Sequence, residues 1–270
     1  MTTTHNQDLI LFEDHSLIPE SIISGEESYS AIISHLQGTS PTWLINSLIE
    51  NSIQNTATLV NNDLTVKQTG RSKTIFISFI NNKDYYSKGC KKNGIDLNTV
   101  TDFTYIDCFT DLFTKRIKDP SKASSQVTSL FQELNEVISS QTGSRKVVFI
   151  EAPEILLRAT NITSNELLNH LLQLNKTCRQ LFIISAKDYP DLDAAMPEDP
   201  VFKVTDYFVK LLHRSSLHIS IQPLLTGRAN DITGSLIVSK GPISYKSINV
   251  SEKEYIFNIT KDSNIKLFFR

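Results

Sequence analysis

Short runs of β-branched and aromatic residues recur along this chain, and they alternate with segments whose apolar residues follow a helical period. The runs lie at 29–36, 74–80 and 103–106, and within 145–157 and 179–186. Such runs are typical of strands that are buried on both faces. Strands of this kind that alternate with helices form a mostly parallel sheet covered by helices. The sequence therefore predicts an α/β fold with a mostly parallel central sheet flanked by helices.

The segments between the runs predict three helices. One amphipathic helix is expected from Pro41 to Ile53, because proline suits a first helical turn, and a second from Ser121 to Ser140. A third follows Ser164, which is a suitable N-cap residue. The polar segment at about 54–73 has almost no aromatic residue, so we expect a mobile loop or insertion there that can hold a short hairpin.

The pattern changes after Ser216, where strands follow one another with short turns between them. The turns contain the sequences GRAND and KDSN, which favour tight reversals of the chain. These strands are expected to form C-terminal antiparallel hairpins that close one edge of the sheet. We find no internal repeat and no linker, so residues 1–270 are predicted to form a single domain.

Charge and composition exclude several classes of protein. The net charge is −2, so the whole chain does not have the basic character of a polyanion-binding protein. We find no apolar run long enough for a membrane span, and the N-terminus does not have the pattern of a secretory signal. The three cysteines are far apart and form no CxxC pair. These features favour a reducing compartment, the cytoplasm or the nucleus.

The turn after the first strand is where a phosphate-binding loop would be expected. Its sequence is Gln37-Gly38-Thr39-Ser40-Pro41-Thr42, and no lysine or arginine occurs between Ser34 and Val66. A phosphate loop needs several inward-pointing N–H groups, a lysine and a hydroxyl for magnesium. Ser40 or Thr42 could supply only the hydroxyl. We therefore interpret Gly38, Thr39, Ser40 and Thr42 as a degenerate phosphate-loop position.

The segment VVFIEAPEILL has the shape of a Walker B strand, in which an acidic residue follows four apolar ones. Glu151 holds the acidic position. Because no phosphate loop accompanies it, we expect Glu151 to be a structural carboxylate bonded to nearby backbone N–H groups, and Glu154 to begin the following turn. The six histidines lie outside the usual hydrolase and metalloprotease patterns, so no catalytic residue, metal or cofactor is expected.

Basic residues near predicted loops are the candidates for a nucleic-acid contact or a protein interface. Lys187 and Lys203 flank a loop that follows a predicted strand, but that loop carries several acidic residues. Arg228 and Lys240 lie around the hairpin TGRANDITGSLIVSK. Each of these four residues could equally be ordinary solvated surface.

Several segments resemble, in the same order, a known family. They are QDLILFEDHSLIPE, WLINSLIE, VVFIEAPEILL, TGRANDITGSLIVSKG and IKLFFR. The chain resembles the sixth subunit of the eukaryotic Elongator complex over most of its length. The resemblance implies a RecA-like fold without working Walker motifs.

The same resemblance implies partners and a function. Subunits four, five and six of that family form a hetero-hexameric ring of RecA-like domains, with two copies of each. The ring attaches to the larger Elongator subunits, binds tRNA and supports modification of the wobble uridine, while ATP hydrolysis has been assigned to the ring as a whole. The chain is therefore expected to be a non-catalytic subunit without a cofactor of its own.

Two other readings remain open at this point. One is a nucleotide hydrolase with an unorthodox phosphate loop, and the other is an unrelated α/β interaction protein. Five aromatic residues are also candidates for interface anchors: Trp43, Tyr85, Tyr86, Phe202 and Tyr207. For Trp43, which lies in a predicted amphipathic helix, packing in the core of the chain itself is expected instead.

Overall fold

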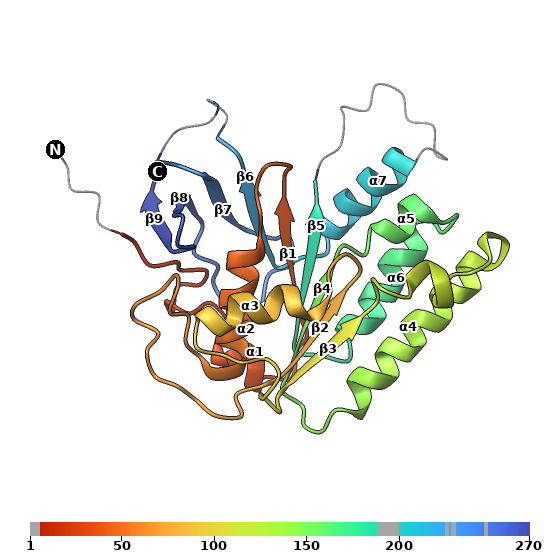
Figure 1. Cartoon of the computed structure of the whole chain (residues 1–270), viewed down its shortest axis with the longest axis horizontal. Helices are drawn as coiled ribbons and strands as arrows, with labels where there is room; N and C mark the ends of the chain where they lie inside the picture. The colour runs from red at the N-terminus through yellow and green to blue at the C-terminus, as the bar shows by residue number, and fades with distance from the viewer. Residues whose placement is uncertain (1–5, 188–199, 225–226, 228–230, 246–247) are drawn as a thin grey trace.

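The fold is built on one sheet of nine strands, in the order β3-β2-β4-β5-β1-β6-β7-β8-β9. It is seen in a computed structural model that describes residues 6–187, 200–224, 227, 231–245 and 248–270. Figure 1 shows the sheet running through the molecule, with β9 at one edge, beside the C-terminus, and β3 at the other edge. The predicted α/β class with a mostly parallel sheet is confirmed, and the arrangement fits a RecA-like fold.

The parallel part of the sheet contains six strands, and the antiparallel part adds three. The parallel strands are β1 (Tyr29–His35), β2 (Lys73–Ser78), β3 (Phe103–Asp107), β4 (Lys146–Glu151), β5 (Gln180–Ala186) and β6 (Leu217–Gln222). The added strands are β7 (Gly234–Lys240), β8 (Lys253–Ile259) and β9 (Ile265–Phe269). The predicted C-terminal hairpins are therefore present, but their first strand, β6, also pairs in parallel with β1.

Helices cover both faces of the sheet (Figure 1), and each face has its own apolar core. One face carries α1 (Glu20–Ser24), α2 (Thr42–Gln54) and α3 (Lys83–Lys92). The other carries α4 (Ala123–Ser140), α5 (Ile155–Ala159), α6 (Ser164–Asn175) and α7 (Pro200–Leu212). This two-sided burial explains why β1, β2, β4 and β5 are apolar on both faces.

Helix α2 differs from the amphipathic helix that its sequence predicts. Every residue from Trp43 to Ile53 is buried, because the sheet lies on one side of the helix and α3 packs on another. The Trp43 ring lies 5.3 Å from that of Phe257 in β8, so its expected packing in the core is confirmed. Tyr86 and Tyr207 are buried as well and Phe202 is half-buried, which leaves Tyr85 as the exposed member of the five aromatic candidates.

Other local predictions need correction. Thr163, and not Ser164, is the N-cap of α6, because its hydroxyl accepts the N–H of Glu166 in a capping box. The segment after β3 contains a π-helical turn at Leu112–Arg116, and the loop at 55–72, where the sequence allows a short hairpin, contains no strand. Helices α3 and α7 were not predicted, because a glycine interrupts the first and an acidic, proline-containing loop precedes the second.

Candidate functional site

The turn after β1 lies where a phosphate loop would be expected, and its backbone offers few free N–H groups. Gly38 has a φ of 87°, a left-handed conformation that suits glycine. The N–H of Thr39 donates to the carbonyl of Leu36, and Pro41 has no N–H. The turn therefore directs few free N–H groups toward a bound anion.

The hydroxyl groups of this turn already have partners. The Thr39 hydroxyl donates to the carbonyl of Leu36 at 2.7 Å. The hydroxyls of Ser40 and Thr42 lie 2.8 Å apart, and that of Thr42 lies 3.0 Å from the hydroxyl of Tyr85 in α3. A magnesium ion bound through Ser40 or Thr42 would have to displace these hydrogen bonds. This arrangement favours the interpretation of the turn as degenerate.

Glu151 ends β4 in a buried polar cluster. Its carboxylate accepts hydrogen bonds from the hydroxyls of Ser78 in β2 and Tyr86 in α3, and the side-chain amide of Asn81 lies 3.4 Å from both oxygens. The hydroxyl of Tyr105 donates to the backbone carbonyl of Asn81 at 2.8 Å and so closes the cluster. The hydrogen-bond partners of Glu151 are therefore side chains and not the backbone N–H groups that the sequence predicts.

Burial decides the protonation of this cluster. Desolvation raises the pKa of Glu151 above its ordinary value of 4.5, and hydrogen bonds from Ser78, Tyr86 and Asn81 only partly oppose that change. Desolvation and the neighbouring Glu151 also raise the pKa of Tyr86, so its hydroxyl stays a donor. These groups satisfy one another and leave little capacity for a metal ion or a water nucleophile.

Glu154 occupies a second buried position nearby. It precedes α5, as expected for a residue that begins the turn, and its carboxylate accepts bonds from the hydroxyl of Ser185 at 2.9 Å and the N–H of Ala186 at 3.0 Å. Burial raises its pKa. Glu154 therefore ties the start of α5 to the end of β5.

The degenerate turn and Glu151 still occupy the two places that a nucleotide site would use. Strand β5 lies between β1 and β4, so the ends of these two strands are about 10 Å apart at ordinary strand spacing. The fold has kept the frame of such a site. Two side chains of α3 lie at these positions: the hydroxyl of Tyr86 donates to Glu151, and the hydroxyl of Tyr85 is hydrogen-bonded to that of Thr42.

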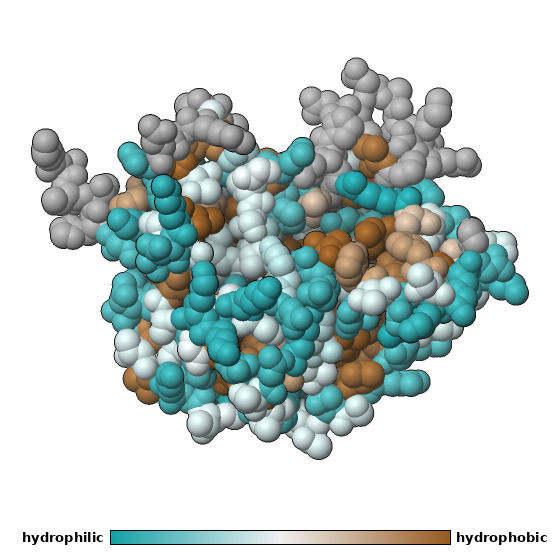
Figure 2. Space-filling view, viewed as in Figure 1, coloured by the Kyte–Doolittle hydropathy of each residue, from teal (hydrophilic) through white to brown (hydrophobic). Residues whose placement is uncertain are grey.

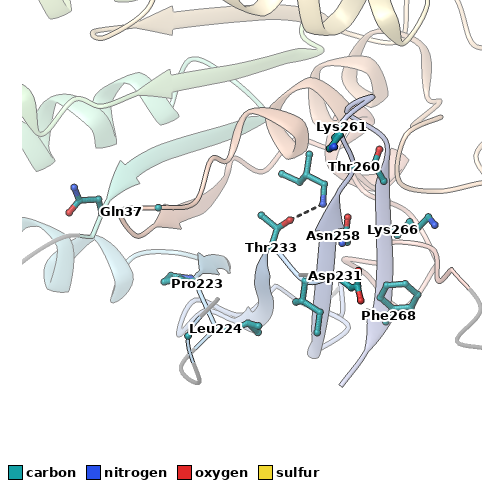
Figure 3. A pocket seen from close by; sticks show the side chains of 14 residues that line it. Gln37, Pro223, Leu224, Asp231, Thr233, Asn258, Thr260, Lys261, Lys266 and Phe268 are labelled. Carbon is teal, nitrogen blue, oxygen red and sulfur yellow. Dashed lines mark hydrogen bonds between the residues drawn. The ribbon is translucent and has the colours of Figure 1, made fainter. Parts of the chain in front are cut away.

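A hollow of about 880 Å³ lies on the other side of the turn, next to the C-terminal hairpins. Figure 3 shows Asn258, Lys266 and Phe268 on the hairpin strands at one side of the hollow and Gln37 of the turn at the other side, with its side chain pointing away from these strands. The hollow also contains Lys261 and Asp231, so cationic and anionic groups are mixed in it. Among the described residues, Glu151 is not part of its lining. Sequence reasoning missed these lysines, because only the tertiary fold brings the β8–β9 hairpin to this turn.

A second hollow of about 400 Å³ lies between the turn, α3 and the tip of the β8–β9 hairpin. Its lining includes Ser40 and Thr42 together with Lys88 and Lys92 of α3. The Lys92 ammonium is 3.2 Å from the hydroxyl of Ser263. The turn has no basic residue of its own, but the fold brings these two lysines to its hydroxyl side.

The basic candidates do not form one surface. Lys187 follows β5 at the carboxyl edge of the parallel strands, where its ammonium lies 5.8 Å from the centre of the Phe208 ring. Lys203 is half-buried near the start of α7. Lys240 pairs with Leu217, the first residue of β6. It therefore lies at the amino ends of the parallel strands, opposite the carboxyl ends where Lys187 lies. Arg228 lies outside the described residues. Lys187 and Lys240 therefore cannot belong to one compact contact.

The described residues offer neither a candidate metal site nor a candidate membrane span. The part of the chain that the structure describes contains no group of three or more His, Cys, Asp or Glu side chains that could hold a metal ion. None of its helices has both the length and the apolar character needed to cross a bilayer.

Comparison with known proteins gives two similar proteins, both from yeasts. Over 281 aligned positions that span both chains completely, the chain is 30% identical to the protein called Elongator complex protein 6 of Saccharomyces cerevisiae. It is 25% identical over 203 positions to the Elongator complex protein 6 homolog of Schizosaccharomyces pombe, covering 71% of this chain and 77% of that protein. No family model matches the chain.

Proposed function

The chain belongs to the Elongator complex protein 6 family, and from this premise we propose that it is a non-catalytic subunit of an Elongator complex. Its partners are Elongator subunits four and five, with which it forms a hetero-hexameric ring of RecA-like domains. The ring attaches to the larger subunits, binds tRNA and supports modification of the wobble uridine. The protein acts in the cytoplasm and the nucleus.

One observation carries the non-catalytic part of this proposal. Glu151, the residue in the Walker B position, is 4% exposed and is held by hydroxyl groups of Ser78 and Tyr86. A carboxylate that serves a magnesium ion or a water nucleophile must have oxygen lone pairs available to it. The turn that faces this position supplies neither a lysine nor a free cradle of N–H groups.

Native mass spectrometry of the chain coexpressed with Elongator subunits four and five tests the assembly. We expect a hexamer with two copies of each chain. A chain that stays monomeric, or forms only a homo-oligomer in the presence of both partners, contradicts the proposal.

ATP hydrolysis by the assembled ring tests the non-catalytic role. Rings that contain Glu151→Gln should hydrolyse ATP at the wild-type rate, provided that native mass spectrometry shows the same assembly. A collapse of the rate in intact rings would assign a catalytic role to Glu151.

The second candidate function is nucleotide binding by an unorthodox phosphate loop, and the hollow that joins Ser40 and Thr42 to Lys88 and Lys92 favours it. Titration of the isolated chain with ATP and magnesium distinguishes the two functions. Micromolar, magnesium-dependent binding that Lys88→Met abolishes would support this second function. The proposed non-catalytic subunit should show no such binding.

A further inference from the structure

The two edge strands of the sheet, β9 and β3, differ in how well their backbone is covered. At one edge, the N-terminal segment covers β9: the N–H of Gln7 donates to the carbonyl of Leu267 at 2.8 Å, and the side-chain oxygen of Asn6 accepts the N–H of Leu267 at 2.7 Å. This edge also carries Lys266 and Arg270. Covering segments and charged residues are the usual means by which proteins prevent strand addition at an edge.

The opposite edge, β3, has no covering segment among the described residues, and its one charged residue, Asp107, lies at the carboxyl end of the strand. Its pairing with β2 uses alternate residues, because Thr74 donates to the carbonyl of Asp102 and Cys108 donates to that of Ser78. The backbone groups of Phe103, Tyr105 and Asp107 therefore point away from β2. Within the described ranges, none of these outward groups makes a hydrogen bond. The strand, FTYID, contains no lysine, arginine or proline.

An exposed apolar patch lies where this open edge ends. It consists of Ile80, Phe109 and Phe113, with exposed fractions of 37%, 52% and 47%. Ile80 and Phe109 each follow by two residues the paired positions Ser78 and Asp107, so the two side chains lie at neighbouring strand ends. Figure 2 shows apolar side chains gathered on this face near the carboxyl ends of β2 and β3.

From these observations we infer that β3 accepts an extended segment of a neighbouring Elongator subunit as a tenth strand of the sheet, and that an apolar side chain of this segment packs on the Ile80–Phe109–Phe113 patch. The occupant is a strand, because outward N–H and C=O groups at alternate residues match the backbone of another strand better than they match any other ligand. Main-chain hydrogen bonds provide the affinity for the segment, and the apolar patch provides the specificity. This inference rests on the proposed membership of an Elongator complex.

A pair of variants isolates the backbone contribution. Tyr105→Pro removes one outward N–H and leaves the bonds to β2 intact, since proline is tolerated on an edge strand when its nitrogen faces outward. Tyr105→Ala loses the same ring contacts with Phe76 and the same bond to Asn81, but it keeps the N–H. We expect Tyr105→Pro to bind the purified subcomplex of subunits four and five at least tenfold more weakly than Tyr105→Ala.

A second pair tests the patch without touching β3. Phe109→Ser should weaken binding to the same subcomplex about tenfold or more. Val209→Ser removes an apolar side chain of 47% exposure from α7 and should leave binding unchanged. Circular dichroism and thermal unfolding of each variant establish that it is folded before its affinity is measured.

Hydrogen–deuterium exchange provides the direct readout. Peptides that cover 103–109 should exchange quickly in the isolated chain and slowly in the assembled ring. If the ring assembles without added protection of this segment, or if Tyr105→Pro binds as well as Tyr105→Ala, the inference fails and the proposed function stands. If the wild-type chain does not assemble, both fail. If the isolated chain dimerises and protects 103–109, the edge belongs to a second copy and the inference is overturned.

Discussion

At the scale of single residues, the most informative feature is the buried carboxylate of Glu151. Its hydrogen-bond partners come from β2 and α3, so the position that resembles a catalytic one contributes to packing. Burial raises its folded-state pKa. An acid whose pKa rises on folding binds protons more tightly in the folded state, so stability falls as pH rises from the unfolded pKa through the folded pKa.

Two substitutions at this position test that account. Glu151→Gln removes the ionisation, so the fall in the free energy of unfolding that begins at about pH 4.5 should become shallower, with the neutral-pH value within about 1 kcal/mol of wild type. Glu151→Ala leaves two buried hydroxyls without an acceptor and should lose about 2–4 kcal/mol. Urea unfolding between pH 4 and 8 measures both. An unchanged pH dependence in Glu151→Gln would show that other groups, such as Glu154, dominate it.

At the scale of elements, local sequence signals and close contacts decide where helices and strands begin and end. Helix α6 illustrates the first, because Thr163 and Glu166 form a reciprocal capping box. The end of β7 illustrates the second: a side chain at Gly241 would put its Cβ 2.0 Å from the carbonyl oxygen of Ser215, which joins α7 to β6. Only glycine allows these two backbone segments to approach so closely.

The capping box gives a prediction with a defined pH window. Thr163→Ala should destabilise the protein by about 1 kcal/mol at neutral pH. The Glu166 side chain accepts the N–H of Thr163, and this bond holds the pKa of Glu166 below its ordinary value of 4.5. Its stabilising effect is therefore present above pH 4.5 and is lost as pH falls through the lower, folded pKa. Glu166→Gln should remove this acid dependence, and unfolding curves at pH 3 to 7 test it.

The close approach at Gly241 gives a second prediction at this scale. Gly241→Ala should cost about 2–3 kcal/mol or more, because the Ser215 carbonyl belongs to the backbone and moves only with α7 or β6. Gly143→Ala is the control: an added Cβ would have no atom within 4 Å, so it should lose only the backbone cost of a φ of +93°, about 1–2 kcal/mol. Equal losses in the two variants, measured by urea unfolding, would contradict the steric account.

At the scale of the whole molecule, charge and topology set the expected interactions. The net charge of −2 gives the isolated chain no overall basic character, and Lys187 and Lys240 lie at opposite ends of the strands, so these two lysines do not form one basic surface. Tight binding of nucleic acid usually requires many phosphate contacts. Any strong interaction of the assembly with tRNA would then depend on surfaces that several subunits share.

We therefore expect the isolated chain to bind tRNA weakly, with affinity falling at least about tenfold between 50 and 200 mM salt. In the assembled ring, Lys187→Ala should reduce the dependence of binding on salt by about one phosphate contact, whereas Lys240→Ala should not. Filter binding at several salt concentrations measures both effects. Tight binding by the isolated chain that does not change with salt would contradict the expectation.

The sequence alone was enough to predict strands β1 to β5 and to show that the turn at 37–42 contains no lysine. These properties follow from residue periodicity and from which side chains are present, and both are local. The RecA-like assignment and the family needed the resemblance of whole segments. The lack of a basic residue in the turn could be read directly, since no fold can add a lysine that the turn does not contain.

Which side chains meet depends on contacts between segments that are distant in the sequence. Tyr86 contacts Glu151 although the two residues are 65 positions apart in the sequence, and Lys88 and Lys92 of α3 lie beside the turn. Lys240 lies at the opposite end of the strands from Lys187. The burial of every residue from Trp43 to Ile53 in α2 and the unequal protection of β3 and β9 also could not be predicted from local patterns. Periodicity specifies which face of an element is buried, whereas strand order and register, set by contacts between distant segments, specify what that face contacts.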